Sequence, residues 1–278
     1  MKTVLFLFLT ILGISIGMRL QAVRAKGQLK CGDRPAARVK VKLWDEDDGP
    51  DPDDVLDEDE TDRNGNFDLE GSTREMTTID PVLKIYHDCD DGIKPGKRKI
   101  KLRIPGQYIS SGSTAKKVFD IGVLNLETIF PKEERFFARL NIFKMHFWFI
   151  FGVLSIASFA MAMRQQAVAI KGKLLCGSAP ARNVRVKLWE EDSGPDPDDL
   201  LSQGYTDEQG MFNLQGDTAE LTTIDPVFKV YHDCDDNLKV LGLRKLKFKI
   251  PSSYISEGKT AKKVFDIGVL NLETIFPV

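Results

Sequence analysis

The stretch that decides the fold is residues 38–44, which read Arg38-Val39-Lys40-Val41-Lys42-Leu43-Trp44. Charged and apolar side chains alternate with a period of two, which is typical of a β-strand with one face in the core and one in solvent. Residues 99–104 have the same alternation. Together with turn-forming residues between them, further short apolar runs predict more strands, at 26–31, 66–70, 82–87 and 117–126. An antiparallel β-sandwich is the fold expected of so many short strands, with about one helical turn near 107–112.

The same pattern occurs twice in the chain. Cys31-Gly32 recurs as Cys176-Gly177, and the Val-Lys-Leu-Trp sequence at 41–44 recurs at 186–189, both at an offset of 145 residues. After the second cysteine of each copy the offset becomes 146, because one residue is inserted in a loop. A period this long indicates tandem domains rather than a solenoid. We therefore expect two all-β domains, at residues 26–135 and 170–278.

An apolar segment precedes each copy. Residues 1–17 have the basic start, apolar run and small residues of a secretory signal peptide, and residues 145–163 repeat this layout. Met1 lies 30 positions before Cys31, and Met145 lies 31 before Cys176. The second segment is thus in register with the first.

Three interpretations of residues 145–163 stay open. A signal-type origin makes the chain a tandem precursor or a fusion of two gene products. A transmembrane helix would tether the protein to a membrane, although the segment is close to the shortest length that spans a bilayer. It would also place the two cysteine-bearing domains in different redox compartments. A buried core helix is the third interpretation. We expect a secreted, extracellular protein, with tethering through 145–163 as the alternative.

Each copy contains two cysteines, and four cysteines allow three pairings. Behind a signal peptide, pairing within each copy is expected, as Cys31–Cys89 and Cys176–Cys234. A metal site is the alternative, but one histidine and two cysteines per copy are few ligands, and the Cys-x-x-Cys spacing of zinc sites is absent. We predict no cofactor and no metal centre.

Several motifs are distinctive when taken together. They are Val186-Lys187-Leu188-Trp189, Gly194-Pro195-Asp196-Pro197-Asp198-Asp199-Leu200, Tyr231-His232-Asp233-Cys234 and Phe265-Asp266-Ile267-Gly268. With them, each copy closely resembles the nematode transthyretin-like protein family over nearly its whole length. The resemblance implies a secreted prealbumin-like (Ig-like) β-sandwich without established enzymatic activity. Members are regarded as extracellular or cell-surface proteins, and most of their ligands are unknown.

The chain departs from this family's pattern in one respect. Members often carry a second cysteine pair, in a Lys-Pro-Cys loop and in a tail after Glu-Glu-Arg. Here the loop reads Lys94-Pro95-Gly96 and the tail reads Glu133-Glu134-Arg135-Phe136. Both cysteines of that pair are therefore missing together, which puts the rigidity of the C-terminal edge in doubt.

The acidic segment 45–60 contains eleven acidic residues. Clustered carboxylates favour Ca²⁺, and Asp51, Asp53 and Asp54 are the weak candidate ligands. Their spacing does not follow the EF-hand pattern. We therefore expect a solvated loop that connects two strands.

Each copy has one histidine, His87 and His232, beside an aspartate and a cysteine. Neighbouring residues in a strand point to opposite faces, so a general-base pair is not expected. The transthyretin superfamily also contains a hydroxyisourate hydrolase, which resembles transthyretin but uses a site with several histidines. We expect a structural role for both histidines and no enzymatic activity.

The outward strand faces are predicted to be basic. The candidate binding residues are Lys99, Lys101, Arg103, Lys245, Lys247 and Lys249. Such faces attract anionic lipid headgroups or sulfated glycans, whereas nucleic acid is not expected. Function is predicted as extracellular or cell-surface recognition of an anionic lipid, glycan or receptor. The alternative is a carrier of a small apolar ligand, and a hydrolase is a remote third.

Overall fold

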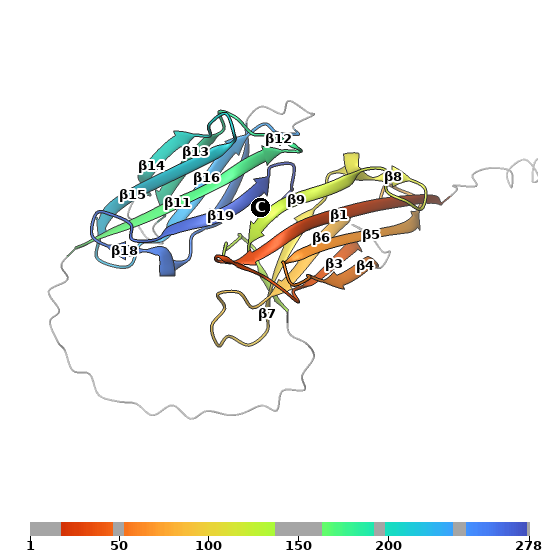
Figure 1. The fold of residues 1–278 in the computed structure, drawn as a ribbon, viewed down its shortest axis with the longest axis horizontal. Coiled ribbons are helices and arrows are strands. Elements are labelled where there is room, and N and C mark those ends of the chain that lie inside the picture. The colour runs from red at the N-terminus through yellow and green to blue at the C-terminus, as the bar shows by residue number, and fades with distance from the viewer. Residues whose placement is uncertain (1–17, 47–52, 137–162, 192–197, 236–242, 277–278) are drawn as a thin grey trace, which may run out of the picture.

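The computed structural model describes residues 18–46, 53–136, 163–191, 198–235 and 243–276. These residues form β-strands and two short 3-10 helices, η1 (Gly106–Tyr108) and η2 (Ser252–Tyr254) (Figure 1). The predicted helical turn near 107–112 overlaps η1. No helix in the described ranges is long and apolar enough to span a membrane. Both signal-like segments lie outside these ranges, except for Met163.

The strands of the two copies follow the same order. In the first copy they are β1 (Arg19–Cys31), β2 (Arg34–Pro35), β3 (Lys40–Asp45), β4 (Asp54–Glu60), β5 (Asn66–Glu75), β6 (Pro81–His87), β7 (Lys97–Arg103), β8 (Ser110–Ser111), β9 (Val118–Asn125) and β10 (Glu134–Phe136). In the second they are β11 (Arg164–Cys176), β12 (Ala179–Pro180), β13 (Arg185–Glu190), β14 (Asp199–Tyr205), β15 (Met211–Glu220), β16 (Pro226–His232), β17 (Arg244–Lys249), β18 (Ser256–Glu257) and β19 (Val264–Asn271).

Each copy is a two-layer sandwich. In the first copy, β5, β1 and β9 lie against a sheet of order β10-β7-β6-β3-β4; in the second, β15, β11 and β19 lie against β14-β13-β16-β17. The core between the layers holds fully buried side chains such as Leu43 and Phe119, which the period-two pattern directs inward. The prediction of an all-β antiparallel sandwich is confirmed, although β1 and β9 pair in parallel, as do β11 and β19.

The expectation of a loop throughout residues 45–60 is wrong. Residues 54–60 form the edge strand β4, which pairs with β3 so that Glu58 lies opposite Lys42 and Glu60 opposite Lys40. Opposite charges on facing positions stabilise an antiparallel pair, and an edge strand leaves the remaining carboxylates in water. Charged side chains on an edge strand also oppose unwanted strand pairing.

The first strand of each copy is longer than expected. β1 begins at Arg19 rather than at residue 26, and it pairs with β5 from Arg19↔Glu75 to Gln28↔Asn66. β11 begins at Arg164 and pairs with β15 in the same way. Both extensions begin with an exposed arginine, Arg19 or Arg164, and continue into buried residues such as Val23 and Val168.

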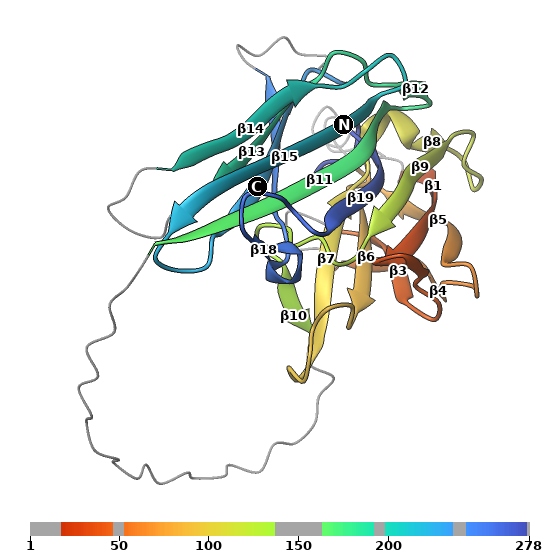
Figure 2. The same cartoon turned by 60° about the vertical axis from the view of Figure 1, so that its left-hand side comes forward.

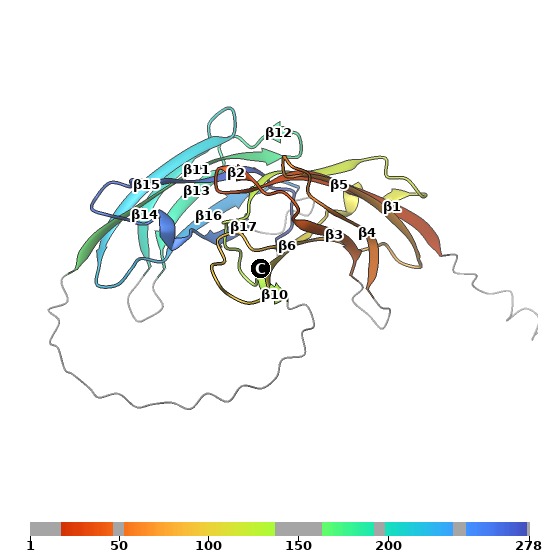
Figure 3. The same ribbon diagram turned by 60° about the horizontal axis from the view of Figure 1, so that its bottom comes forward.

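The two copies share one sheet. β9 and β19 pair antiparallel, from Gly268↔Leu124 to Leu270↔Gly122, and form a ten-stranded sheet across the molecule (Figure 2). The contacts are reciprocal, since Asn125 Nδ2 donates to Asp266 O and Asn271 Nδ2 donates to Asp120 O, both at 2.8 Å. Such reciprocity is typical of an isologous dimer interface. Figure 3 shows the β3-containing and β13-containing sheets on the same side of this shared sheet.

Candidate functional site

The outer face of the first copy carries a cluster of cations that we call cationic face 1. Its residues are Lys40, Lys42, Lys84, Lys99, Lys101 and Arg103. They come from the middle strands β3, β6 and β7, where register places Lys42 beside Lys84 and Lys84 beside Lys101. Because side chains alternate along a strand, these residues share the face away from the core.

Carboxylates neutralise most of cationic face 1. Glu58 pairs with Lys42 at 2.5 Å and with Lys40 at 3.3 Å. Glu46 pairs with Lys84 at 2.6 Å and with Lys101 at 3.0 Å. Lys99 pairs with Glu134 of β10 at 2.6 Å. The face predicted to be basic is therefore a mixed lattice of ion pairs, with acidic residues from β4 and β10 on the same surface.

Lys84 was not among the residues that the sequence singled out. It is 5% exposed, and its Nζ lies 3.9 Å from the centroid of the Trp44 ring. Burial lowers the pKa of this lysine, and its hydrogen bond to Glu46 only partly opposes that effect. Burial also acts on Glu46, but the hydrogen bonds from its two lysines outweigh it and hold the pKa of this carboxyl below its usual value. The sequence does contain a signal for Lys84, because it is a lysine within the otherwise mostly apolar strand Pro81–His87.

The second copy has the corresponding cationic face 2 with fewer acids. Its residues are Arg185, Lys187, Lys229, Lys245, Lys247 and Lys249. Opposite Arg185 and Lys187, β14 supplies Tyr205 and Gln203 where β4 has Glu60 and Glu58. Arg185 therefore hydrogen-bonds to a neutral amide, with Nη2 donating to Gln203 Oε1 at 3.0 Å.

Lys187 lies among aromatic rings instead of carboxylates. Its Nζ is 5.2 Å from the ring centroid of Trp189 and 5.7 Å from that of Tyr231. Within the described ranges it has no ion pair, whereas its counterpart Lys42 is held by Glu58. An ammonium group over aromatic rings stays available to an anion, because the rings bring no negative charge that must be displaced.

Lys245 is the second uncompensated cation of this face. It is exposed and has no carboxylate partner in the part of the chain that the structure describes. Partial burial lowers its pKa, and the ammonium groups of Lys229 and Lys247 lower it further. Its counterpart Lys99 is paired with Glu134 of β10, a strand that the described part of the second copy lacks.

The other predicted binding residues have partners or lie apart. Glu191 joins Lys229 and Lys247, each at 2.6 Å, and Lys249 pairs with Asp225 at 3.3 Å. Arg103 is exposed at the end of β7, where its backbone bonds to Ile275 of the second copy. On cationic face 2, two lysines thus share the carboxylate of Glu191, while Lys187 and Lys245 have no ion pair in the described ranges.

The candidate calcium ligands are not gathered into one cluster of described residues. Asp53 Oδ2 lies 3.9 Å from Lys84 Nζ, and Asp54 is exposed at the start of β4. Asp51 lies outside the described residues. Calcium binding by this segment stays an untested alternative to the prediction of no metal centre.

Both histidines are buried at the ends of β6 and β16. His87 is 2% exposed and His232 5%. Burial lowers the pKa of His87 to about 3 and that of His232 to about 4, and the charges of Arg98 and Arg244 act in the same direction. His87 Nδ1 accepts a hydrogen bond from Cys89 N at 3.3 Å. Neither ring is accessible to a substrate as a general base.

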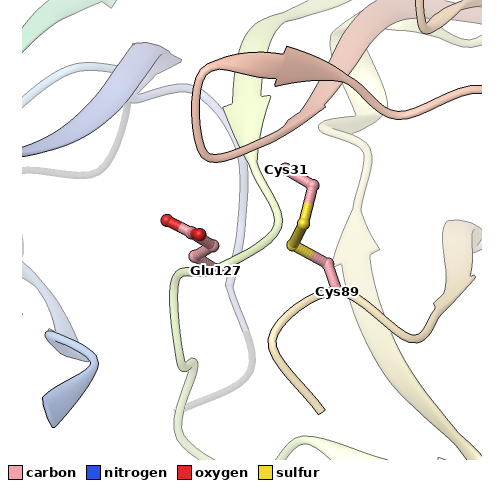
Figure 4. Close-up of side chains that lie close together, drawn as sticks. All are labelled: Cys31, Cys89 and Glu127. Atoms are coloured by element: carbon pink, nitrogen blue, oxygen red, sulfur yellow. A yellow bond between two sulfur atoms is a disulfide. The ribbon is translucent and has the colours of Figure 1, made fainter. Parts of the chain in front are cut away.

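A carboxylate lies beside each disulfide. The structure contains Cys31–Cys89 and Cys176–Cys234, each with a Cα–Cα distance of 5.7 Å. Glu127 lies close to the first disulfide, with its carboxylate pointing away from the two sulfur atoms (Figure 4). It accepts a hydrogen bond of 2.6 Å from Tyr254 Oη of the second copy. Because the sulfurs are bonded to each other, this group serves the contact between copies and is not a set of metal ligands.

An apolar hollow of about 490 Å³ lies at the junction of the two copies. Its lining combines Phe130 and Pro131 of the first copy with Leu246, Phe248 and Phe276 of the second. The Phe130 ring stacks on Phe276 at 5.1 Å between centroids and meets Phe248 edge-on at 5.9 Å. Sequence patterns within one copy could not show this hollow, because both copies build it.

Comparison with known proteins agrees with the repeat. A family model described as TTR-52, transthyretin-like family, matches residues 26–105 and 171–251. Transthyretin-like protein 46 of Caenorhabditis elegans is 66% identical over 124 residues, which cover 45% of this chain and 69% of that protein. Transthyretin-like protein 5 of the same organism is 42% identical over 135 residues, which cover 49% and 97%.

A solved structure, a 9R-lipoxygenase from Cyanothece, is 24% identical over 38% of this chain and 16% of its own, with a TM-score of only 0.23. Membership of the transthyretin-like family is therefore supported by the sequence matches, and the β-sandwich fold of both copies agrees with it. Two separate regions match the family model, and each corresponds to one copy. The chain belongs to the transthyretin-like family, of which it contains two domains in tandem.

Proposed function

We propose that this chain is a secreted, non-enzymatic binding module that docks on anionic surfaces through cationic face 2. The observation that carries the proposal is the loss of acids from that face. Lys187 and Lys245 have no carboxylate partner in the described ranges, while their counterparts Lys42 and Lys99 are paired at 2.5 and 2.6 Å. The ligand chemistry is a phosphate- or sulfate-bearing surface, either lipid headgroups or a sulfated glycan.

Electrostatics and shape both support this assignment. Clustered lysines attract a polyanion over about a Debye length, and each contributes on the order of 1 kcal/mol near an anionic membrane. Tyr205 and Leu200 of β14 are 60% and 42% exposed beside the cations. These side chains can pack against the ligand surface once the charges have brought it close.

An extracellular location is part of the proposal. Two within-copy disulfides are typical of proteins that fold in oxidising compartments. The signal-like segments 1–17 and 145–163 are consistent with secretion. Recognition rather than catalysis is supported by the burial of both histidines and by the engagement of all four cysteines in disulfides.

Binding to vesicles and to a sulfated polysaccharide tests this proposal. We expect the full chain to bind vesicles with anionic phospholipid, or immobilised heparin, and to dissociate as salt increases. Lys187→Glu should weaken binding about twentyfold, since the charge changes by two. The matched variant Lys42→Glu, on cationic face 1, should have little effect.

The vesicle assay and the heparin assay distinguish a lipid headgroup from a sulfated glycan as the ligand. Binding to vesicles alone assigns a lipid headgroup, and binding to heparin alone assigns a glycan. Equal losses from Lys187→Glu and Lys42→Glu would contradict the assignment to cationic face 2. So would tight binding that does not respond to salt.

The apolar hollow favours a second candidate, a carrier of a small apolar ligand. Phe130, Phe248 and Phe276 provide a lining that suits an aliphatic or aromatic molecule. A fluorescent apolar probe should bind the wild-type chain and lose affinity in Leu246→Lys. Unchanged probe binding in that variant would exclude the hollow as the site.

A further inference from the structure

The edge of β7 in the first copy is covered by the short strand β10. Glu134 lies opposite Lys99, Arg135 opposite Arg98 and Phe136 opposite Lys97. Ion pairs hold the strand and the residue before it, among them Glu134 to Lys99 at 2.6 Å and Glu133 to Arg98 at 2.8 Å. The glutamates of this segment thus dock on a basic edge.

An aromatic contact and an arginine fix the far end of β10. The Phe136 ring meets Tyr86 edge-on, at 5.1 Å between centroids. Arg135 pairs with Asp91 and donates to Pro95 O at 3.2 Å. These contacts join the tail to the loop that precedes β7.

The second copy presents the same edge without a strand on it. β17 is paired along one side by β16, and its last residue, Lys249, bridges to Ile129 of the first copy. In the described part of the chain, no strand pairs with the side of residues 243–245 that faces away from β16, and we call this side the open edge. An unpaired edge offers backbone N–H and C=O groups to an extended segment.

The side chains around the open edge match those that hold β10. Lys245, Arg244 and Tyr231 occupy the positions of Lys99, Arg98 and Tyr86. Lys245 has no carboxylate partner among the described residues, and Arg244 donates to Cys234 O at 2.9 Å. Leu243 stands where the first copy has Lys97, and it is 57% exposed.

We propose that the open edge is a docking site for an extended acidic–aromatic segment of a partner polypeptide, which adds a strand to β17. The partner's carboxylates bind Lys245 and Arg244, and an aromatic side chain two residues after the acid packs on Tyr231 and Leu243. This site uses the edge of the sheet and shares Lys245 with cationic face 2, whereas Lys187 belongs only to the outer face.

Comparison of the two copies indicates the chemistry of the segment that would bind the open edge. The residues that hold Glu133, Glu134 and Phe136 in the first copy recur here, and the exposed Leu243 adds an apolar contact where the first copy has Lys97. Lys245 also has a lowered pKa, caused by partial burial and then by Lys229 and Lys247. An approaching carboxylate offsets the repulsion from these two lysines.

A peptide with the sequence of residues 131–136, Pro-Lys-Glu-Glu-Arg-Phe, is the probe. We expect it to bind the full chain at one site, measured by fluorescence anisotropy, and to protect the amides of residues 243–245 from hydrogen exchange. Lys245→Glu should weaken binding about twentyfold, and a peptide with lysine in place of Glu134 should recover that affinity on the variant.

Two control variants distinguish peptide binding at the open edge from binding at other surfaces. Lys99→Glu, the same change in the first copy, should leave peptide affinity unchanged. Lys187→Glu should weaken vesicle or heparin binding and leave peptide affinity unchanged, so the two proposals fail separately. Absence of saturable binding would overturn the proposal, as would exchange protection at β7 or equal losses from both lysine variants. Concentration-dependent dimers, lost in Lys245→Glu without peptide binding, would assign the edge to a second copy instead.

Discussion

The buried histidines predict that stability falls with pH below neutrality. An unfolded histidine titrates near pH 6.5, whereas burial lowers the folded pKa of His87 to about 3 and that of His232 to about 4. Between these values the unfolded chain binds protons that the folded chain does not. The stabilising contribution is therefore fully present above pH 6.5 and is lost as the pH falls toward 4 and then 3.

The size of the effect follows from the pKa difference. Between pH 7 and pH 5, each histidine lowers the free energy of unfolding by about 2 kcal/mol, or about 4 kcal/mol for both. Both rings are more than nine-tenths buried in the structure, so solvent screens little of this effect. A loss of about 2 kcal/mol in each copy is a sizeable part of the stability of an ordinary domain.

Urea unfolding at pH 7 and pH 5 measures the prediction. The wild-type chain should lose about 4 kcal/mol, His87→Gln about half of that, and His87→Gln/His232→Gln close to none. Asp88→Asn, which removes an exposed neighbouring carboxylate, serves as the control and should keep the wild-type difference. An unchanged pH dependence in the double variant would refute the reasoning.

The disulfides and the junction between copies give further predictions. Replacing Cys176 and Cys234 by serine should lower the free energy of unfolding on the order of 4 kcal/mol, because the disulfide closes a loop of separation 58; an unchanged urea midpoint would contradict this. Gly268 has φ +87°, and a Cβ there would collide with Val123 O of the other copy. Gly268→Ala should therefore separate β9 from β19, seen as faster amide exchange at Val123 and a larger radius of gyration. Gly258→Ala, with φ +98° and open space around it, is the matched control; equal effects of the two would show that backbone strain alone is responsible.

The fold was accessible from the sequence because its signals are local. The alternation at 38–44 and 99–104 depends only on which side chains face the core, and the exact repeat of motifs defines two copies. β4 was missed because its acidic side chains hide the alternation of an edge strand. Its pairing depends on Lys40 and Lys42 of another strand, and no local pattern reports such a partner.

The sequence predicted only part of the candidate site, because the rest depends on which residues of different strands lie side by side. Lysines on the outer faces were predicted, but their ion pairs depend on cross-strand register. Whether Lys99 or Lys245 is compensated depends on β10, which is present in one copy only among the described residues. The hollow and the shared sheet require both copies at once, so a pattern read within one copy does not contain them.

The most direct test of docking through cationic face 2 exchanges the residue that lies opposite a lysine between the two faces. Gln203 lies opposite Lys187, and Glu58 lies opposite Lys42. Gln203→Glu should weaken binding to anionic vesicles or heparin about fivefold, and Glu58→Gln should strengthen it by about the same factor. If neither exchange changes affinity, or if both change it in the same direction, cationic face 2 is not the docking surface.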